Sequence, residues 1–424
     1  MATTLASAGS RLWAPVRVTS FRRLWLGQSF SLLGDGFSYV AFSWITLSLT
    51  RSTLVLGYVL AMQAVPRAAL TLVGGSLSDK WSARVLMALS SWARTIVMTA
   101  VAAIGFAHLL SIWMLLVAAA AFGSVDAFFQ PARASILPSV VEKDLLAPAN
   151  SLLSVGSRIS AVLGPAVGGI VVAVSDARFA FLVDGVCFAL CGLCVSRVIP
   201  LPKPRAGKGP ESGSPADPAV PESKDTLLAR IRIGLRYAWQ DPRIRTMLVV
   251  DTAVTFCYAG PFNVGFADLA KFHLSGGAAA LGLLSGSLAG GALLGALAGG
   301  LVGRQLRVGL LVAALAGWLA VGMTMLGIMH NVAAAVGIVL AMGFAIGFQG
   351  VFGISWVQRN IHGSVLSRVI SIDMLFGYIA APVSLVLCGA FAQTRLEEMF
   401  GGIALILAIT ALGILSSKPV REMK

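Results

Sequence analysis

Residues 74–84 read Gly-Gly-Ser-Leu-Ser-Asp-Lys-Trp-Ser-Ala-Arg and form a short charged segment between two long apolar stretches. A glycine lets two helices approach closely, and Asp79 can cap the helix that follows. Lys80 and Arg84 favour a position on the cytoplasmic face of a membrane, where basic residues accumulate. Taken alone, the segment is also compatible with a polar turn flanked by positive charge, so its interpretation depends on the rest of the chain.

The composition decides between these interpretations. Of the 424 residues, 57% are hydrophobic and 12% are charged, and apolar stretches recur from about Arg22 to Ser416. A soluble core cannot absorb that much apolar surface, whereas each helical crossing of a bilayer needs about 20 mostly apolar residues. We therefore predict an all-α polytopic membrane protein. Its twelve transmembrane helices are expected to begin near residues 22, 54, 85, 112, 149, 178, 244, 278, 308, 332, 367 and 396.

The basic residues support an even number of crossings. With both termini in the cytoplasm, only four of the 32 Lys and Arg residues fall outside, namely Arg51, Arg178, Lys271 and Arg395. Because Lys and Arg accumulate in cytoplasmic loops, a wrong helix count would destroy this asymmetry. The net charge of +14 therefore reflects topology and contact with the lipid bilayer. It does not indicate a nucleic-acid partner.

A linker divides the chain into two halves. Residues 199–225 are rich in Pro, Gly, Ser and charge, which is typical of a flexible connection. Residues 226–240 place apolar and basic side chains on separate stripes, which predicts an amphipathic helix at the cytoplasmic interface. The first twenty residues lack the apolar region of a cleavable signal. We expect a cytoplasmic tail (1–21), a six-helix bundle (22–198), the linker with its interfacial helix (199–243), a second six-helix bundle (244–416) and a second cytoplasmic tail (417–424).

Short matches at similar offsets suggest that the two bundles are related by internal pseudo-symmetry. They are Gly74-Gly75 with Gly299-Gly300, Phe129-Gln130 with Phe348-Gln349, and Gly164-Pro165 with Ala381-Pro382.

The charged segment resembles motif A of the major facilitator superfamily, G-x-L-x-D-R-x-G-R-R/K, which lies between the second and third helices. The chain keeps Gly75, Leu77, Asp79, a basic residue at Lys80, and Arg84. It departs from the motif at Ser82 and Ala83. The resemblance implies that Gly75, Asp79, Lys80 and Arg84 act as a conformational switch.

A second motif lies in the fifth predicted helix. Ser160-Ala-Val-Leu-Gly164-Pro165-Ala-Val-Gly168-Gly169 resembles motif C of the antiporters, G-x-x-x-G-P-x-x-G-G, with Ser in place of the first Gly. Proline removes a backbone donor and the glycines permit close packing. Ordinary helix packing is the alternative interpretation. Within the superfamily the motif is associated with exporters, so the resemblance favours outward transport.

Further segments narrow the resemblance. Phe129-Gln-Pro-Ala-Arg-Ala-Ser-Ile-Leu-Pro138, Asn150-Ser, and Gly234-Leu-Arg-Tyr before Asp241-Pro242 are similar to the enterobactin-exporter and macrolide-efflux branch. The similarity runs from about Phe21 to Ala392 and is stronger in the first half. It implies an exporter of drugs, antibiotics or siderophores in the bacterial inner or plasma membrane, driven by a proton gradient.

Ionisable side chains inside the predicted helices are candidates for coupling, because each costs about 2.5 to 3.5 kcal/mol at the centre of a membrane helix. The candidates are Asp35, Arg67, Arg94, Asp126 and Arg158, all in the first half. In the superfamily, helices 1, 4, 7 and 10 line the central cavity, which implies that Asp35 and Asp126 carry protons with Arg94 or Arg67 as partners. A permanent structural ion pair is the alternative, and it fits Asp126 as well as proton transfer does.

The second half offers fewer candidates. Asp251 and Asp373 lie near cytoplasmic helix ends, where capping or loop contacts explain them. An aromatic side chain recurs at every fourth position through Phe344, Phe348, Phe352 and Trp356. This aromatic stripe can stack on a large amphipathic substrate, or it can pack against neighbouring helices or lipid.

No pattern in the sequence indicates catalysis or a cofactor. Cys187, Cys191 and Cys194 fall on one side of a helix without a histidine, so we expect no metal site. Phosphate-loop, zinc-protease and nucleophile–base motifs are also missing from the sequence. An ion gradient is therefore a more plausible energy source than ATP.

Together these observations predict a secondary active transporter that works by alternating access. Its partners are expected to be an amphipathic small-molecule substrate, protons and the lipid bilayer. A proton-coupled exporter is favoured, an uptake symporter or facilitator on the same fold is the alternative, and a membrane-embedded enzyme fits less well. The sequence leaves the oligomeric state open, with a monomer as the simplest expectation.

Overall fold

The structure is a computed structural model, and it describes residues 13–201, 242–301, 308–360 and 363–416. Within the helices, the side chains of 72–80, 242–244, 247, 308, 353–360 and 363–371 lie outside this description. Every regular element in the described ranges is helical. The expected linker with its interfacial helix (199–243) falls almost wholly outside the described residues, as does the tail 417–424.

Six long helices form the first bundle. They are α2 (Thr19–Thr50), α3 (Thr53–Lys80), α4 (Ala83–Phe106), α5 (Ile112–Ile136), α6 (Leu146–Val174) and α7 (Ala177–Ser196). Short 3-10 turns lie at η1 (Ala14–Arg17), η2 (Leu137–Ser139) and η3 (Lys143–Leu145). The first helix therefore begins at Thr19, three residues earlier than expected.

The second bundle begins with a broken helix. This helix comprises α9 (Pro242–Gly260), η4 (Pro261–Gly265), α10 (Phe266–Asp268) and η5 (Leu269–His273), and η4 and η5 are π-helical. Pro261, which lacks a backbone donor, starts the first π turn. The other helices are α11 (Gly277–Leu301), α12 (Val308–Gly327), α13 (Val332–Asn360), α14 (Gly363–Thr394) and α15 (Leu396–Ser416).

The predicted all-helical membrane fold is confirmed. Within the described ranges, 11 helices are long and apolar enough to cross a membrane. The broken helix from Pro242 to His273 supplies the twelfth crossing at the place where the sequence predicts one. Each observed helix begins within a few residues of its predicted start.

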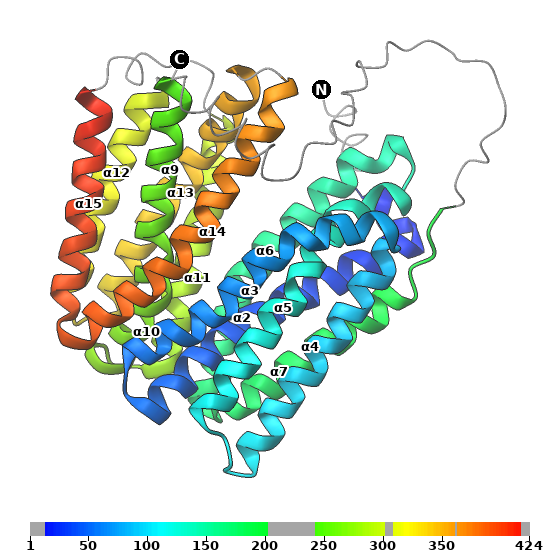
Figure 1. Ribbon diagram of the computed structural model, residues 1–424, viewed down its shortest axis with the longest axis horizontal. Helices are drawn as coiled ribbons and strands as arrows, with labels where there is room; N and C mark the ends of the chain where they lie inside the picture. Colours follow the sequence, from blue (N-terminus) through cyan, green and yellow to red (C-terminus); the bar gives the residue numbers. More distant parts are fainter. Residues whose placement is uncertain (1–12, 202–241, 302–307, 361–362, 417–424) are drawn as a thin grey trace, which may run out of the picture.

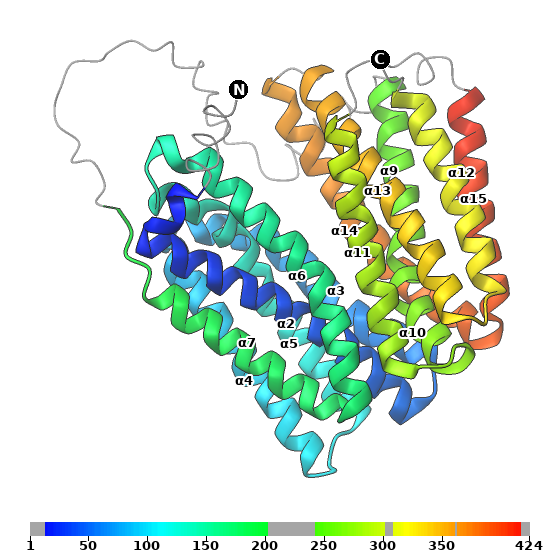
Figure 2. The same cartoon turned by 180° about the vertical axis from the view of Figure 1, so that it is seen from behind.

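The two bundles form a V (Figures 1 and 2). They touch at one end, hereafter the closed end, through the pairs α3 with α14 and α6 with α11. They diverge toward the other end, hereafter the open end, where α15 finishes and α9 begins (Figure 1).

Glycines bring the bundles into backbone contact at the closed end. A Cβ atom added to Gly169 of α6 would lie 2.5 Å from the Ala278 carbonyl oxygen and 2.8 Å from the Cα of Gly282 in α11. On the other side of the interface, a Cβ on Gly57 of α3 would lie 2.5 Å from the Leu385 oxygen of α14. A larger residue at these positions would separate the helices, so the closeness of the V depends on glycine.

The connections at the closed end are short and capped. Arg51 ends α2 in the left-handed conformation with φ 50°. Gly276 and Gly277 have φ 114° and 54° and make the turn into α11, a conformation that side chains disfavour. Asp176 caps α7 by accepting from the Arg178 backbone N–H, and Asn331 caps α13 in the same way.

Candidate functional site

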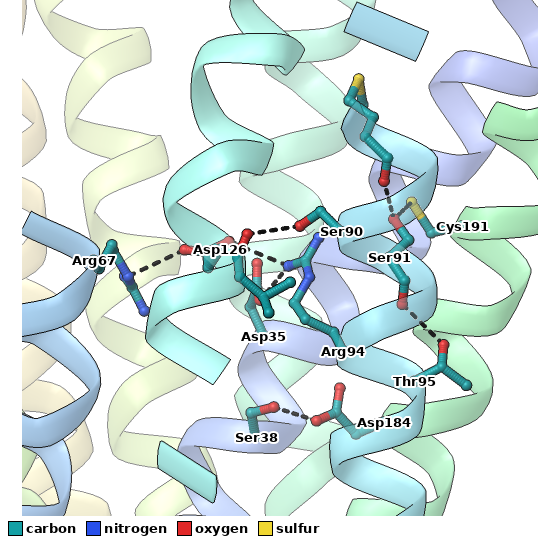
Figure 3. Close-up of polar contacts among 12 residues, drawn as sticks. Asp35, Ser38, Arg67, Ser90, Ser91, Arg94, Thr95, Asp126, Asp184 and Cys191 are labelled. Carbon is teal, nitrogen blue, oxygen red and sulfur yellow. Dashed lines mark hydrogen bonds and ion pairs between the residues drawn. The ribbon is translucent and has the colours of Figure 1, made fainter. Parts of the chain in front are cut away.

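Four ionisable side chains meet in the interior of the first bundle, each from a different helix (Figure 3). Asp35 comes from α2, Arg67 from α3, Arg94 from α4 and Asp126 from α5. We call these four residues the polar cluster. The Arg67 Nε atom lies 3.1 Å from Asp126 Oδ2, and Arg94 Nη1 lies 3.2 Å from Asp126 Oδ1 and 3.5 Å from Asp35 Oδ1. The structure thus brings together four of the five predicted ionisable residues.

Arg94 is the centre of the cluster. Its side chain is fully buried, and its guanidinium lies between the rings of Phe129 and Phe188, 4.2 and 4.3 Å from their centroids. Aromatic faces attract a cation and exclude water, which fixes the guanidinium in place. One terminal nitrogen serves both carboxylates, while its Nε and Nη2 atoms have no hydrogen-bond partner among the described residues.

The two carboxylates are held differently. Asp126 is buried, with a side chain 4% exposed, and it is paired with both arginines. Asp35 has a side chain 33% exposed and a single, longer contact to Arg94. Removing one partner of a buried ion pair leaves an uncompensated charge and is strongly destabilising. The two arginines therefore hold the Asp126 carboxylate in place. Asp35 is the carboxylate that a proton or ligand can reach.

A cavity of about 310 Å³ opens beside the cluster, between the two bundles. Its lining comes from α2, α3, α5, α9, η4 and α14, and consists of Asp35, Tyr39, Leu60, Gln63, Ala64, Arg67, Phe122, Asp126, Gln130, Ala259, Asn263, Ala381 and Leu385. Tyr39 donates to the Phe262 and Asn263 carbonyl oxygens, each at 3.1 Å, and so joins the bundles across this cavity.

Asp184 of α7 is a buried acidic residue that the sequence reasoning missed. It has no exposed surface, and the Ser38 hydroxyl of α2 donates to its Oδ2 atom (Figure 3). The signal was present, because Asp184 lies inside the apolar stretch that begins near residue 178.

Arg158 does not join the polar cluster. It is exposed on α6, and the structure gives it no ion pair with a described residue. The sequence predicts that Arg158 lies deep within its helix, as observed, but it does not show that the side chain points away from the polar cluster.

The motif A residues lie at the open end of α3 and the start of α4. The side chains of Gly75, Asp79 and Lys80 are outside the described part of the chain. Arg84 is described, and its Nη1 atom donates to the Val198 carbonyl oxygen at 2.9 Å, at the end of the first bundle. The switch role expected for these residues remains a prediction.

The motif C glycines lie where three helices meet. Gly164 and Pro165 of α6 face Gly36 of α2, where an added Cβ would lie 2.6 Å from the Gly164 carbonyl carbon. Gly168 faces Phe37 of α2, and Gly169 faces α11 of the other bundle. This stretch therefore joins the first bundle's own packing to the contact between bundles.

Neighbouring rings of the aromatic stripe on α13 contact one another. The Phe344 and Phe348 ring centroids are 6.2 Å apart and those of Phe348 and Phe352 are 5.1 Å apart. None of these three lines the cavity beside the polar cluster. The Trp356 side chain lies outside the described residues. A role in substrate stacking remains a prediction.

Two acidic residues of the second bundle form a pair. Asp251 of α9 and Asp373 of α14 lie close enough for their side chains to interact. Neither caps a helix, because Asp251 is the tenth residue of α9 and Asp373 the eleventh of α14, so the expectation that they cap helix ends was wrong. Asp268 lies near the closed end, 3.5 Å from His273 Nε2.

Comparison with known proteins agrees with this architecture. The family model described as Major Facilitator Superfamily matches residues 24–385. The chain is 26% identical over 392 residues to the multidrug efflux pump Tap of Mycolicibacterium fortuitum, covering 90% of this chain and 91% of the relative. It is 22% identical over 377 residues to macrolide efflux protein A of Streptococcus pyogenes, covering 88% and 89%.

Among solved structures, the nucleoside transporter NupG superposes with a TM-score of 0.72 at 11% identity, covering 94% of this chain and 100% of that one, which shows a shared fold. With twelve crossings in two bundles and a family match over most of its length, the chain belongs to the major facilitator superfamily.

Proposed function

We propose that this protein is a proton-coupled exporter of amphipathic small molecules, acting as a monomer by alternating access in the cell membrane. The observation that carries the proposal is the state of Asp35, a carboxylate one-third exposed to the cavity and held by one arginine at 3.5 Å. The names of the similar proteins, a multidrug efflux pump and a macrolide efflux protein, support export.

The distribution of charge supports an orientation. Basic residues at the open end include Arg17, Arg23, Lys143 and Arg197, whereas the helix ends at the closed end carry few. The positive-inside tendency then places the open end in the cytoplasm. In this orientation the structure is the inward-open state, ready to take substrate from the cytoplasm.

Competition at Asp35 provides a mechanism of exchange. In the inward-open state, a substrate that offers an amine or another hydrogen-bond donor binds the Asp35 carboxylate. After the bundles rock to open outward, a proton from outside binds Asp35 and releases the substrate. Because the proton and the substrate occupy the same carboxylate in turn, each outward movement of substrate is tied to inward movement of a proton.

The walls of the cavity suit an amphipathic substrate. Leu60, Phe122 and Leu385 supply apolar surface, and the amides of Gln63 and Asn263 supply sparse polar contacts. Sugars need many more hydrogen bonds than this lining offers. Asp35 is the more accessible acidic group of this cavity, so we propose a preference for substrates that carry a positive charge.

Contacts between bundles at the closed end act as an outer gate in this proposal. The Lys271 ammonium of η5 donates to Ser48 Oγ of α2 at 2.6 Å and lies 3.8 Å from the Trp44 ring centroid. Thr53 of α3 donates to the Gly389 carbonyl oxygen of α14 at 2.8 Å. These bonds must break before substrate can leave toward the outside.

Transport into inverted membrane vesicles tests the proposal. When the vesicle interior is acidified, an exporter should accumulate a fluorescent amphipathic quaternary ammonium cation without ATP, and Asp35→Asn should abolish the accumulation. Arg158→Gln, which changes an exposed residue outside the polar cluster, serves as the control. Accumulation that persists in Asp35→Asn would refute the assignment of Asp35, and accumulation driven only by the opposite gradient would favour an uptake symporter.

A further inference from the structure

Asp184 is a buried carboxyl that the proposed exchange at Asp35 does not use. Its side chain has no solvent exposure, and only one of its oxygens, Oδ2, accepts a hydrogen bond, from Ser38. The Oδ1 atom has no hydrogen-bond partner among the described residues. A buried polar atom without a partner is costly, so its retention calls for an explanation.

The packing of α2 provides a space for this carboxyl. A Cβ atom added to Gly34 would lie 2.6 Å from Asp184 Oδ1, so any larger residue at this position would collide with it. The carboxyl thus lies against bare backbone, between Gly34 and Ser38. These two residues flank Asp35 along the same helix, and the Asp184 carboxyl is close enough to interact electrostatically with Asp35.

The charges around Asp184 come from two neighbouring helices. α7 packs against α2, α4 and α6. Asp35 of α2 and Arg94 of α4 interact with Asp184 electrostatically, and Cys187 lies one turn away on α7 itself. On α6, Arg158 is exposed and forms no ion pair with a described residue. Arg94 already binds two other carboxylates, so Asp184 has no arginine of its own.

Counting charges shows where a proton fits. Within the polar cluster, two carboxylates are balanced by two guanidiniums in direct ion pairs. Asp184 is a third carboxyl, and no described cation lies within ion-pair distance of it. Arg133, two turns from Asp126 on α5, is a further guanidinium that interacts electrostatically with Asp35 and Asp126 and forms no ion pair with a described residue. An isolated carboxylate is far more costly to bury than a carboxylic acid, so Asp184, which has no described cation within ion-pair distance, is the favoured place for a proton.

On the basis of the proposed proton coupling, we propose that Asp184 holds a proton in the inward-open state and, once the bundles have opened outward, passes it to Asp35 through the Ser38 hydroxyl. In this step the Ser38 hydroxyl, which donates to Asp184 Oδ2 in the inward-open state, turns toward Asp35. The proton of Asp184 then binds Ser38 Oγ while the original hydroxyl proton of Ser38 moves to Asp35. Asp184 becomes a carboxylate and Asp35 becomes neutral, so the total charge is unchanged.

The position of Ser38 gives this step a direction. Ser38, which donates to Asp184, lies three residues beyond Asp35 toward the closed-end terminus of α2 at Thr50, or about 4.5 Å along the helix. The hydroxyl that connects the two carboxyls therefore lies on the closed-end side of Asp35, which is the outer side in the proposed orientation. A proton that enters from outside can then pass through Asp184 and Ser38 to Asp35.

Infrared spectroscopy of the purified protein tests the location of the proton without any transport. A protonated carboxyl has a carbonyl stretching band that shifts in deuterium oxide. The difference between wild type and Asp184→Asn at neutral pH should contain this band. Asp176→Asn is the matched control on the same helix, because asparagine caps a helix as well as aspartate does. No band in the wild-type minus Asp184→Asn difference would show that Asp184 is ionised and would overturn the proposal.

Proton release from acidified inverted vesicles tests the transfer. Substrate should evoke release in wild type and Asp176→Asn, and at least tenfold less in Asp184→Asn and Ser38→Ala. Substrate binding to each purified variant distinguishes a lost proton from a lost fold. Release by Asp184→Asn at the wild-type rate would overturn the transfer step. If wild type releases no protons, the proposed coupling and the transfer both fail, while the infrared band still decides where the proton lies.

Discussion

The backbone contact between α6 and α11 predicts how a single methyl group should shift the conformation. A Cβ atom added to Gly282 would lie 2.5 Å from the Pro165 carbonyl oxygen and 3.0 Å from the Cα of Gly169. Ordinary van der Waals contact begins near 3.4 Å, so Gly282→Ala overlaps backbone that has little freedom to move. Gly290 lies on the same helix, and a Cβ added there meets nothing within 4 Å.

Overpacking of this kind costs about 1 to 3 kcal/mol. If the contact is specific to the inward-open state, Gly282→Ala should favour the outward-open state by a factor of about 5 to 150. Replacing glycine by alanine also stabilises a helix by about 1 kcal/mol in every state. Gly290→Ala carries that helix effect without the overlap, and it is therefore the matched control.

Distances between spin labels measure the shift. Labels on Ser175→Cys, at the end of α6, and Asn331→Cys, at the start of α13, report the separation of the bundles at the closed end. Gly282→Ala should enrich the longer distance, whereas Gly290→Ala should reproduce the distribution of the parent protein. Equal distributions for the two alanine variants would refute the conclusion that this contact holds the closed end together.

Three further predictions follow from the polar cluster, the outer gate and motif A. Asp126→Asn should destabilise the protein by about 3 to 5 kcal/mol, because it removes a buried partner of two arginines, and Asp35→Asn should destabilise it by clearly less. Thermal unfolding of both variants in detergent measures the difference, and equal losses of stability would contradict the conclusion that the two carboxylates are held differently. Lys271→Met removes a cation–π contact worth about 0.5 to 2 kcal/mol and should increase the labelling of cavity residues by reagents added from outside. Unchanged labelling would contradict a role of Lys271 in the proposed outer gate. Asp79→Asn should slow switching between states without preventing substrate binding, and normal turnover with normal exchange kinetics would argue against the motif A assignment.

The sequence predicts the number and positions of the helices because bilayer thickness imposes a length on each apolar stretch. The seventh crossing tests this rule most severely. Its helix changes to π turns at Pro261 and carries Asp268, Lys271 and His273 near its end, yet the apolar stretch predicted to begin near residue 244 marks its position.

The depth of a residue along a membrane helix can be predicted from the sequence, but the side of the helix on which its side chain packs cannot. Arg94 and Arg158 are both deep in their predicted helices, yet one is fully buried between aromatic rings and the other is exposed. Direction depends on how neighbouring helices pack, and this is set by contacts between residues far apart in the chain. The pairing of Asp251 with Asp373 could not be predicted for the same reason.

The state of the transporter also lies beyond sequence reasoning. The V shape depends on which ends of α3, α6, α11 and α14 are in contact, and alternating access requires that two such arrangements have similar free energies. The sequence encodes both arrangements, so patterns of apolar residues do not select one. The glycines at Gly57 and Gly169 become informative only when the helices that face them are known.

The internal pH of acidified inverted vesicles, followed as amphipathic quaternary ammonium cations are added, tests the central claim most directly, because these cations cannot take up protons themselves. The account predicts that substrate releases protons from vesicles with wild-type protein, and that Asp35→Asn abolishes the release while Arg158→Gln leaves it unchanged. Equal release by wild type and Asp35→Asn would contradict the claim that Asp35 couples substrate to protons.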